Sequence, residues 1–250
     1  MRTRRRWVVA GVVAVPLAFA VVLAVEVELA RRGPTLPETE PHDLDGLVGR
    51  ADGGDPIHLV WLGDSTAAGV GASSRDGALP RQVAALLDRP VRVTGLAVSG
   101  ARVGEVVEDQ AGLADLDPDV VLVSVGANDV THLGTLGAFE DQYRDLVAAL
   151  PDGVDVVLLG VPDMGSIPRL AQPLRAIAGF RGRQLDEVVR DVAAEVGAAY
   201  VDIAGSTGPA FRADSDRYYA ADDYHPDDDG YRLWAEAVVA VLADEVLPER

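Results

Sequence analysis

The hydrophobic positions of this chain follow two alternating patterns from residue 57 onward. Five short apolar runs, mostly rich in β-branched residues, predict buried strands: Ile57–Leu62, Val91–Ala97, Val120–Val125, Val154–Leu159 and Ala199–Ile203. Segments with helical spacing lie between and after these runs: Leu79–Leu87, Val103–Leu113, Phe139–Leu150, Leu174–Val196 and Asp228–Val246. Strands that are apolar along their length and alternate with helices predict an α/β fold, with a mostly parallel five-stranded sheet covered on both faces.

This topology predicts where a functional site would form. Right-handed crossovers place the loops that follow the parallel strands at one edge of the sheet, and sites in open α/β sheets form at that edge. Polar residues that directly follow the predicted strands are therefore the first candidates for chemistry.

The N-terminus has a different pattern from the rest of the chain. Four Arg residues lie among the first six positions, and an uncharged run, Trp7–Val25, follows them. As a helix this run would span roughly 28 Å, close to the thickness of a hydrocarbon core. Basic residues before the run would keep the N-terminus in the cytoplasm and send the rest of the chain outward. We therefore predict one N-terminal transmembrane helix, with the domain extracytoplasmic at the cell membrane.

A cleaved signal peptide is the alternative for residues 1–30. Ala18-Phe19-Ala20 resembles a signal-peptidase site and would give a secreted protein, although the apolar run continues beyond it. Residues 31–56 are rich in Pro, Gly and acidic residues, which predicts a linker in which Asp43–Val48 could form one helical turn. The predicted catalytic domain is then 57–250.

Composition excludes several classes of function. The 250 residues contain no Cys, so a disulfide, a thiolate nucleophile and a thiolate metal site are all excluded. The formal net charge is -18, which argues against a nucleic-acid partner because phosphates require a basic face. The sequence does not indicate an oligomeric state.

The first candidate group is a serine after the first predicted strand, in Gly63-Asp64-Ser65-Thr66. A Ser hydroxyl is a weak nucleophile and needs an adjacent base. The strand-to-helix turn would expose Oγ and leave backbone N–H groups free to stabilise developing negative charge. The alternative is an ordinary turn Ser that caps a helix.

His225 is the natural base for such a serine. It lies in Asp222-Asp223-Tyr224-His225-Pro226, and a carboxylate three residues earlier can curl back to accept from Nδ1–H. That contact would fix the tautomer and leave Nε2 to take a proton from Ser65. Asp223 is a rival for the acid role. The acidic run that follows predicts a helix start with Asp227 as N-cap, and a Ca²⁺ site there stays open as an alternative.

Two further positions would complete an oxyanion hole. Asn128 follows the third predicted strand in Gly126-Ala127-Asn128-Asp129, and Gly100 follows the second. The Asn128 amide and the N–H groups of Gly100 and Ser65 are three donors from three loops, which suits a tetrahedral intermediate of acyl transfer. Taken alone, the Asn128 segment is equally well explained as a plain turn.

In order and placement, these four segments resemble the motifs of the SGNH (GDSL-type) hydrolase family over about residue 57 to the C-terminus. The resemblance implies a flavodoxin-like three-layer α/β/α fold, with Ser65 as nucleophile, His225 as base and Asp222 as acid. It also implies that the oxyanion hole comprises Ser65, Gly100 and Asn128. Thr66 and Ser99 stand where the family often has Leu and Asn, and neither difference affects the chemistry. The Gly-x-Ser-x-Gly elbow of α/β-hydrolases is absent.

We therefore expect a serine esterase acting on acyl or acetyl esters of lipid or cell-envelope glycan. The implied reaction requires no metal and no organic cofactor. The open alternatives are an acyltransferase that uses the same acyl-enzyme and a non-catalytic binding module. The Pro/Gly-punctuated segment 161–173 could line the site, with Arg169 or Arg175 meeting an anionic head group or a surface carboxylate.

Overall fold

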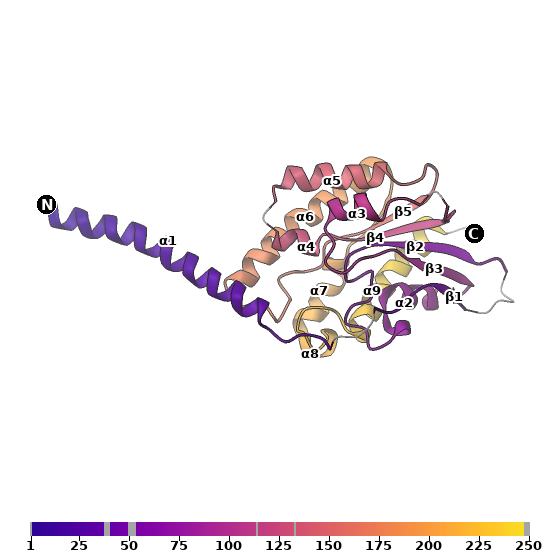
Figure 1. Ribbon diagram of the computed structural model, residues 1–250, viewed down its shortest axis with the longest axis horizontal. Helices are drawn as coiled ribbons and strands as arrows, with labels where there is room; N and C mark the ends of the chain where they lie inside the picture. The colour runs from indigo at the N-terminus through magenta and orange to yellow at the C-terminus, as the bar shows by residue number, and fades with distance from the viewer. Residues whose placement is uncertain (1, 38–40, 50–53, 114, 133, 248–250) are drawn as a thin grey trace.

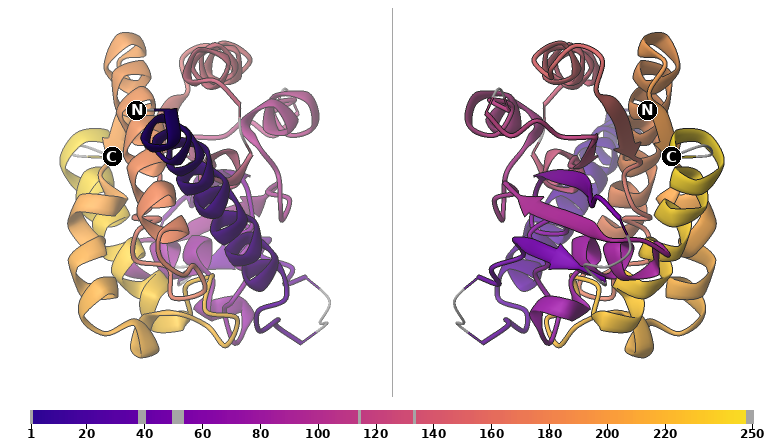
Figure 2. Two further views of the ribbon diagram at one scale, coloured as in Figure 1. Left: turned by 90° about the vertical axis from the view of Figure 1, so that its left-hand side faces the viewer. Right: turned by 90° about the vertical axis from the view of Figure 1, so that its right-hand side faces the viewer.

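A computed structural model shows six strands in one sheet with helices on both faces (Figures 1 and 2). It describes residues 2–37, 41–49, 54–113, 115–132 and 134–247, with side chains from residue 16 onward. The strands are β1 (Gly46–Val48), β2 (Ile57–Gly63), β3 (Val91–Gly95), β4 (Val120–Ser124), β5 (Asp155–Leu159) and β6 (Ala199–Val201). All five predicted strands are present, within a few residues of the expected bounds.

The strand order is β1-β3-β2-β4-β5-β6, and every pair except β1–β3 is parallel. Among the five parallel strands alone, the order is 2-1-3-4-5, the flavodoxin-like arrangement. The order reverses between β2 and β4, so the loops that follow these two neighbouring strands flank the topological switch point. Those are the loops that carry Ser65 and Asn128.

The prediction of five strands was wrong by one. The missed strand, β1, pairs antiparallel with β3 at the edge of the sheet, and it lies inside the segment predicted as a linker that could form one helical turn. It escapes sequence analysis because it has three residues, begins with Gly and is only half-buried. Neither a period-2 pattern nor a β-branched run can show in so short a strand.

The helices cover the two faces of the sheet with two separate apolar clusters. On one face lie α3 (Val103–Asp109), α4 (Ala127–Thr131), α5 (Leu136–Ala148) and α6 (Leu174–Val196). On the other lie α2 (Leu79–Leu86), α7 (Ile203–Ala213), α8 (Ser215–Tyr218) and α9 (Asp228–Val241), followed by a π-helical turn over Leu242–Val246. The central strands contribute side chains to both clusters, because successive side chains of a strand point to opposite faces of the sheet. Val60 and Leu62 pack in the first cluster, whereas Leu59 and Trp61 pack in the second.

The N-terminal helix α1 (Arg2–Arg31) extends away from this body (Figure 1). In the part of the chain that the structure describes, no helix has the length and apolarity needed to cross a membrane. The predicted transmembrane helix is thus observed as a helix but not confirmed as a span. Part of the predicted run, residues 7–15, lies outside the positions whose side chains are described.

The C-terminal end of α1 is attached to the body by two polar contacts. The buried carboxylate of Glu26 accepts a hydrogen bond from the backbone N–H of Leu174 at 2.9 Å, at the first residue of α6. The guanidinium of Arg169 donates to the carbonyl of Ala30 at 2.6 Å, near the end of α1. Because Pro173 offers α6 no capping side chain, Glu26 caps that helix from a distant part of the sequence.

Candidate active site

The last residue of β2, Gly63, lies very close to the backbone of its partner Ser124 at the end of β4. Gly63 has a φ of +142°, and a Cβ at this position would lie 2.0 Å from the carbonyl oxygen of Ser124. Only glycine fits there. The side chain of Gln110, which sequence analysis did not single out, holds both backbone groups of Gly63, at 2.7 Å to the N–H and 3.0 Å to the carbonyl.

The three predicted chemical groups meet at this edge of the sheet. His225 Nε2 lies 2.9 Å from Ser65 Oγ, and His225 Nδ1 lies 2.6 Å from Asp222 Oδ2. The other oxygen of Asp222 accepts the backbone N–H groups of Tyr224 and His225 at 3.1 and 3.0 Å. The fold therefore brings together a serine and a histidine that are 160 residues apart in the sequence.

The position of the rival acid, Asp223, is different. It is exposed and has a φ of +57°, and its carbonyl accepts the N–H of Arg169 at 3.0 Å. Asp222, not Asp223, contacts the imidazole. Burial opposes ionisation of Asp222, but the hydrogen bonds from His225 and Tyr224 outweigh it and hold the Asp222 pKa below its usual value.

Backbone contacts join the two ends of the loop that carries His225. Tyr219 and Pro226 form an isolated antiparallel bridge, and the N–H of Ala220 donates to the carbonyl of His225 at 2.8 Å. Asp227 then caps α9 by accepting the N–H of Gly230 at 2.9 Å, as predicted. Its two acidic neighbours also have protein partners: Asp228 accepts from Ser73, and Asp229 pairs with Arg217.

The candidate oxyanion donors are only partly assembled in one place. Ser65 and Asn128 line the same pocket, and the Asn128 amide donates to the carbonyl of Ala101 at 3.0 Å, which leaves its second N–H available. Gly100 does not line that pocket. It lies one residue from Ala101 in an exposed turn with a φ of +88°.

A buried cluster of polar side chains stabilises the loop that carries Ser65. Asp64 is 1% exposed, and its Oδ1 accepts both the N–H and the hydroxyl of Thr66 at 2.9 Å. The Thr66 hydroxyl also lies 2.8 Å from Ser124 Oγ at the end of β4. Burial raises the pKa of Asp64 to about 6, although the hydrogen bonds from Thr66 oppose this shift. The roles of Thr66 and Ser124 in this cluster were not predicted.

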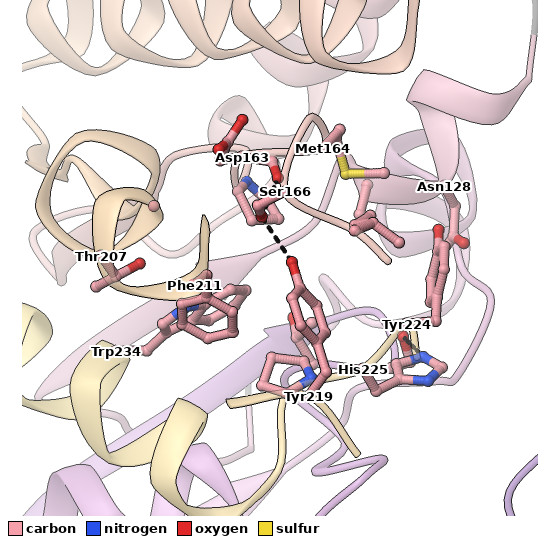
Figure 3. Close-up of a pocket in the computed structure, with 17 residues that line it drawn as sticks. Asn128, Asp163, Met164, Ser166, Thr207, Phe211, Tyr219, Tyr224, His225 and Trp234 are labelled. Carbon is pink, nitrogen blue, oxygen red and sulfur yellow. Dashed lines mark hydrogen bonds between the residues drawn. The ribbon is translucent and has the colours of Figure 1, made fainter. Parts of the chain in front are cut away.

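The pocket that contains Ser65 and His225 has mostly apolar walls (Figure 3). About 510 Å³ of empty space is associated with it, part of which is open solvent. As expected, the segment after β5 contributes to the wall through five residues: Pro162, Asp163, Met164, Ser166 and Ile167. Aromatic side chains from α7, α9 and the His225 loop complete it, and only their position in the fold reveals this role.

The two arginines considered for an anionic head group are used internally. Arg169 donates to the carbonyls of Ala30 and, at 3.4 Å, Asp222. Arg175 donates to the carbonyls of Leu170 and Pro168 at 2.6 and 2.7 Å. Both side chains thus bind backbone carbonyls and tie the segment after β5 together.

Comparison with known proteins agrees with this fold and shows the family. The model of the GDSL-like lipase/acylhydrolase family matches residues 61–233. A GDSL-like esterase of Mycobacterium tuberculosis is 31% identical over 224 residues, covering 82% of this chain and 70% of that protein. The chain therefore belongs to the GDSL-like lipase/acylhydrolase family, and it is an SGNH-type ester hydrolase.

Two solved structures show the same fold at lower identity. A lipase/acylhydrolase from Enterococcus faecalis has a TM-score of 0.60 and 20% identity, covering 78% of this chain and 99% of that one. A phospholipase A1 from Streptomyces albidoflavus has a TM-score of 0.57 and 22% identity, covering 75% of this chain and 100% of that one. Both support the α/β architecture of the domain.

The raised pKa of Asp64 predicts a pH-dependent stability. Because the folded-state pKa of about 6 lies above the ordinary value of 3.8, the folded chain binds this proton more tightly, and stability falls as pH rises through that window. Asp64→Asn keeps the acceptor for Thr66 and removes the charge. We expect its gain in unfolding free energy over wild type to increase between pH 4 and pH 7, by up to about 3 kcal/mol.

Thermal and denaturant unfolding across that pH range measures this effect. Asp191→Asn, at an exposed position on α6, is the matched control and should show no such increase. A gain for Asp64→Asn that is the same at both ends of the range would contradict the assignment of the raised pKa.

Proposed function

We propose that this ester hydrolase is a serine esterase that acts on acyl or acetyl esters of lipid or cell-envelope glycan through an acyl-enzyme on Ser65. The observation that carries the proposal is the continuous hydrogen-bonded series from Ser65 Oγ through His225 to Asp222, which opens into an apolar pocket. Ser65 as a whole residue is only 6% exposed, so a substrate reaches its hydroxyl through the pocket.

The chemical step follows from this geometry. Ser65 Oγ attacks the ester carbonyl carbon while its proton passes to His225 Nε2. The C–O bond to the alcohol breaks, and the alcohol leaves with that proton. Water then attacks the acyl-enzyme, gives its proton to the same nitrogen, and releases the acid as Ser65 Oγ regains a proton. Asp222 holds Nδ1–H throughout and stabilises the imidazolium, a role that its lowered pKa favours.

In this mechanism the N–H of Ser65 and the amide of Asn128, which both line the pocket, donate to the oxyanion, and the third donor is the N–H of Gly100 in the turn beside Ala101. The hydrogen bond from Asn128 to the carbonyl of Ala101 orients that amide beside the turn of Gly100. An amide that is already oriented stabilises a developing oxyanion without further ordering.

An apolar wall favours esters with a hydrocarbon acyl group. Met164, Ile167 and Phe211 are each at most 5% exposed and line the pocket together with Trp234. Transfer of the acyl group from Ser65 to a sugar or lipid alcohol instead of water uses the same groups, so we keep acyltransfer as an alternative.

We also propose that α1 anchors the chain at the cell membrane with the catalytic domain outside the cytoplasm. The support is the Arg cluster before the apolar run and the exposure of the large apolar side chains that are described on α1: Leu17, Phe19, Val21, Val22, Val25 and Leu29. Exposed contiguous apolar surface of this kind is expected to be covered by lipid or by a partner.

The first prediction of this proposal concerns the nucleophile. We expect Ser65→Ala to abolish cleavage of p-nitrophenyl esters, tested from acetyl to palmitoyl on the full-length chain, because no other group forms the acyl-enzyme. Circular dichroism should be unchanged. A variant that keeps a substantial part of the wild-type rate would reject Ser65 as nucleophile. Absence of cleavage by folded wild type, with activity restored by an alcohol acceptor, would favour acyltransfer.

A second prediction concerns the oxyanion hole. Asn128→Ala should lower kcat by roughly 10²–10³-fold, the usual loss for a single oxyanion donor, with little change in KM. Steady-state kinetics on the best ester of the series measures it, and melting temperature reports whether loss of the contact with Ala101 affects folding. Near-normal turnover would remove Asn128 from the mechanism.

A third prediction concerns the anchor. The full-length chain expressed in bacteria should fractionate with membranes and resist carbonate extraction, because the apolar run would remain in the bilayer. Cleavage after Ala20 would instead release a shortened form, which mass spectrometry of the secreted fraction identifies. Full-length chain found wholly in the soluble fraction would contradict both the anchor and the signal.

A further inference from the structure

The pocket of the candidate active site has two parts (Figure 3). One part contains the reacting groups together with Asn128 and Tyr224. The other reaches toward the helices on the second face of the sheet, where its walls are Thr207 and Phe211 of α7 and Trp234 of α9. All three of these inner side chains are buried, at 3 to 5% exposure, so this part lies inside the domain.

Tyr219 stands between the two parts. Its hydroxyl lies 2.6 Å from Ser166 Oγ on the opposite wall, the contact drawn as a dashed line in Figure 3. Its ring meets the ring of Phe211 edge-on, with centroids 5.0 Å apart. Tyr219 and Ser166 belong to segments 53 residues apart, so this hydrogen bond joins the His225 loop to the segment after β5 across the pocket.

The direction of the hydrogen bond follows from the partners of Ser166. The Ser166 hydroxyl donates its only hydrogen to the carbonyl of Asp163, at 2.6 Å. Tyr219 must therefore be the donor to Ser166 Oγ. Burial raises the pKa of Tyr219 well above its ordinary value, so the phenol keeps this hydrogen.

The Ser166 side of the contact is held in place by further interactions. The turn of Asp163 is held by its salt bridge to Arg212 and by the N–H of Gly165, which donates to Asp163 Oδ1 at 3.1 Å. Gly208 on α7 leaves no spare room, since a Cβ there would lie 3.1 Å from Asp163 Cβ. The inner wall is thus close-packed, and Tyr219 lies between it and the part of the pocket that contains the reacting groups.

We propose that the Tyr219–Ser166 hydrogen bond is a gate that sets the length of the acyl chain this enzyme accepts. The inference rests on the acyl-enzyme at Ser65 and extends it to substrate class. Short acyl groups occupy the part beside His225 with the gate closed. A longer chain reaches the space lined by Phe211 and Trp234 only when it breaks the hydrogen bond and displaces the ring.

The gate predicts a break in the chain-length profile. Each methylene that enters apolar walls contributes about a fourfold gain in kcat/KM. In wild type this gain in kcat/KM should stop at the acyl-chain length whose end reaches the ring of Tyr219. In Tyr219→Ala it should continue through the longer esters, so that the ratio of kcat/KM for octanoyl to butyryl p-nitrophenyl ester rises by at least about tenfold.

Two conservative variants separate the gate from a folding defect. Tyr219→Phe keeps the ring and loses the donor, and Ser166→Ala loses the acceptor. Both should raise the same ratio by a smaller factor, because the ring then moves without breaking a hydrogen bond. Tyr218→Ala is the matched control: this neighbouring tyrosine also packs on Phe211, at 5.3 Å between centroids, but does not line the pocket. Its ratio should equal that of wild type.

The outcomes distinguish this inference from the function on which it rests. Failure of wild type to cleave any ester in a Ser65-dependent way would overturn the esterase proposal itself. Ser65-dependent cleavage with an unchanged ratio in all three pocket variants would overturn the gate alone. A ratio that falls in Tyr219→Ala would also overturn it, because Tyr219 would then be a wall that binds long chains.

Discussion

At the carboxyl ends of β2 and β4 the chain passes so close to itself that position 63 has no space for a side chain. This contact between Gly63 and Ser124 brings together the two loops that flank the reversal of strand order. The side-chain amide of Gln110 stabilises the contact by binding both backbone groups of Gly63. Ser65 follows two residues after Gly63, and Asn128 four residues after Ser124. The relative placement of nucleophile and amide donor is thus set by the main-chain geometry of two paired strands, which holds a site more precisely than loops alone do.

The same edge of the sheet carries a buried carboxylate to which the proposed mechanism assigns no chemical step. Asp64 is desolvated, and its ionisation weakens the folded state at neutral pH. Asp64 also positions Thr66, the residue after the serine, and through Thr66 the end of β4, by a series of three hydrogen bonds. Local polar order at the site is obtained at the expense of global stability, a balance that is common where a protein must hold reactive groups rigidly.

Much of the domain could be read from sequence because its periodic segments are long or strongly apolar. Helix α6 has the predicted bounds, Leu174–Val196, and the central strands shift by at most a few residues. The pairing of His225 with Asp222 was also accessible, since three residues within one turn can reach each other. Short elements gave no periodic signal, and β1 and the helices α4 and α8 were missed for that reason. Helix α7 was missed because its first residue was assigned to the preceding strand and because it contains Gly205, Gly208 and Pro209, which are unfavourable inside helices. Contacts between segments distant in sequence, such as Gln110 with Gly63 or Tyr219 with Ser166, depend on topology that no local pattern records.

The attachment of α1 has a consequence for how this protein can be divided. Arg169 binds the last turn of α1 with one nitrogen and faces the carbonyl of Asp222 with another, so one side chain connects the N-terminal helix to the loop that presents the catalytic acid. Glu26 meanwhile supplies the cap that α6 lacks. Residues 26–33 are therefore structural components of the catalytic body, although the sequence assigns them to an anchor and a linker. A truncation intended to leave the enzyme intact has its natural boundary before Glu26, within the helix, and not at the start of the sheet.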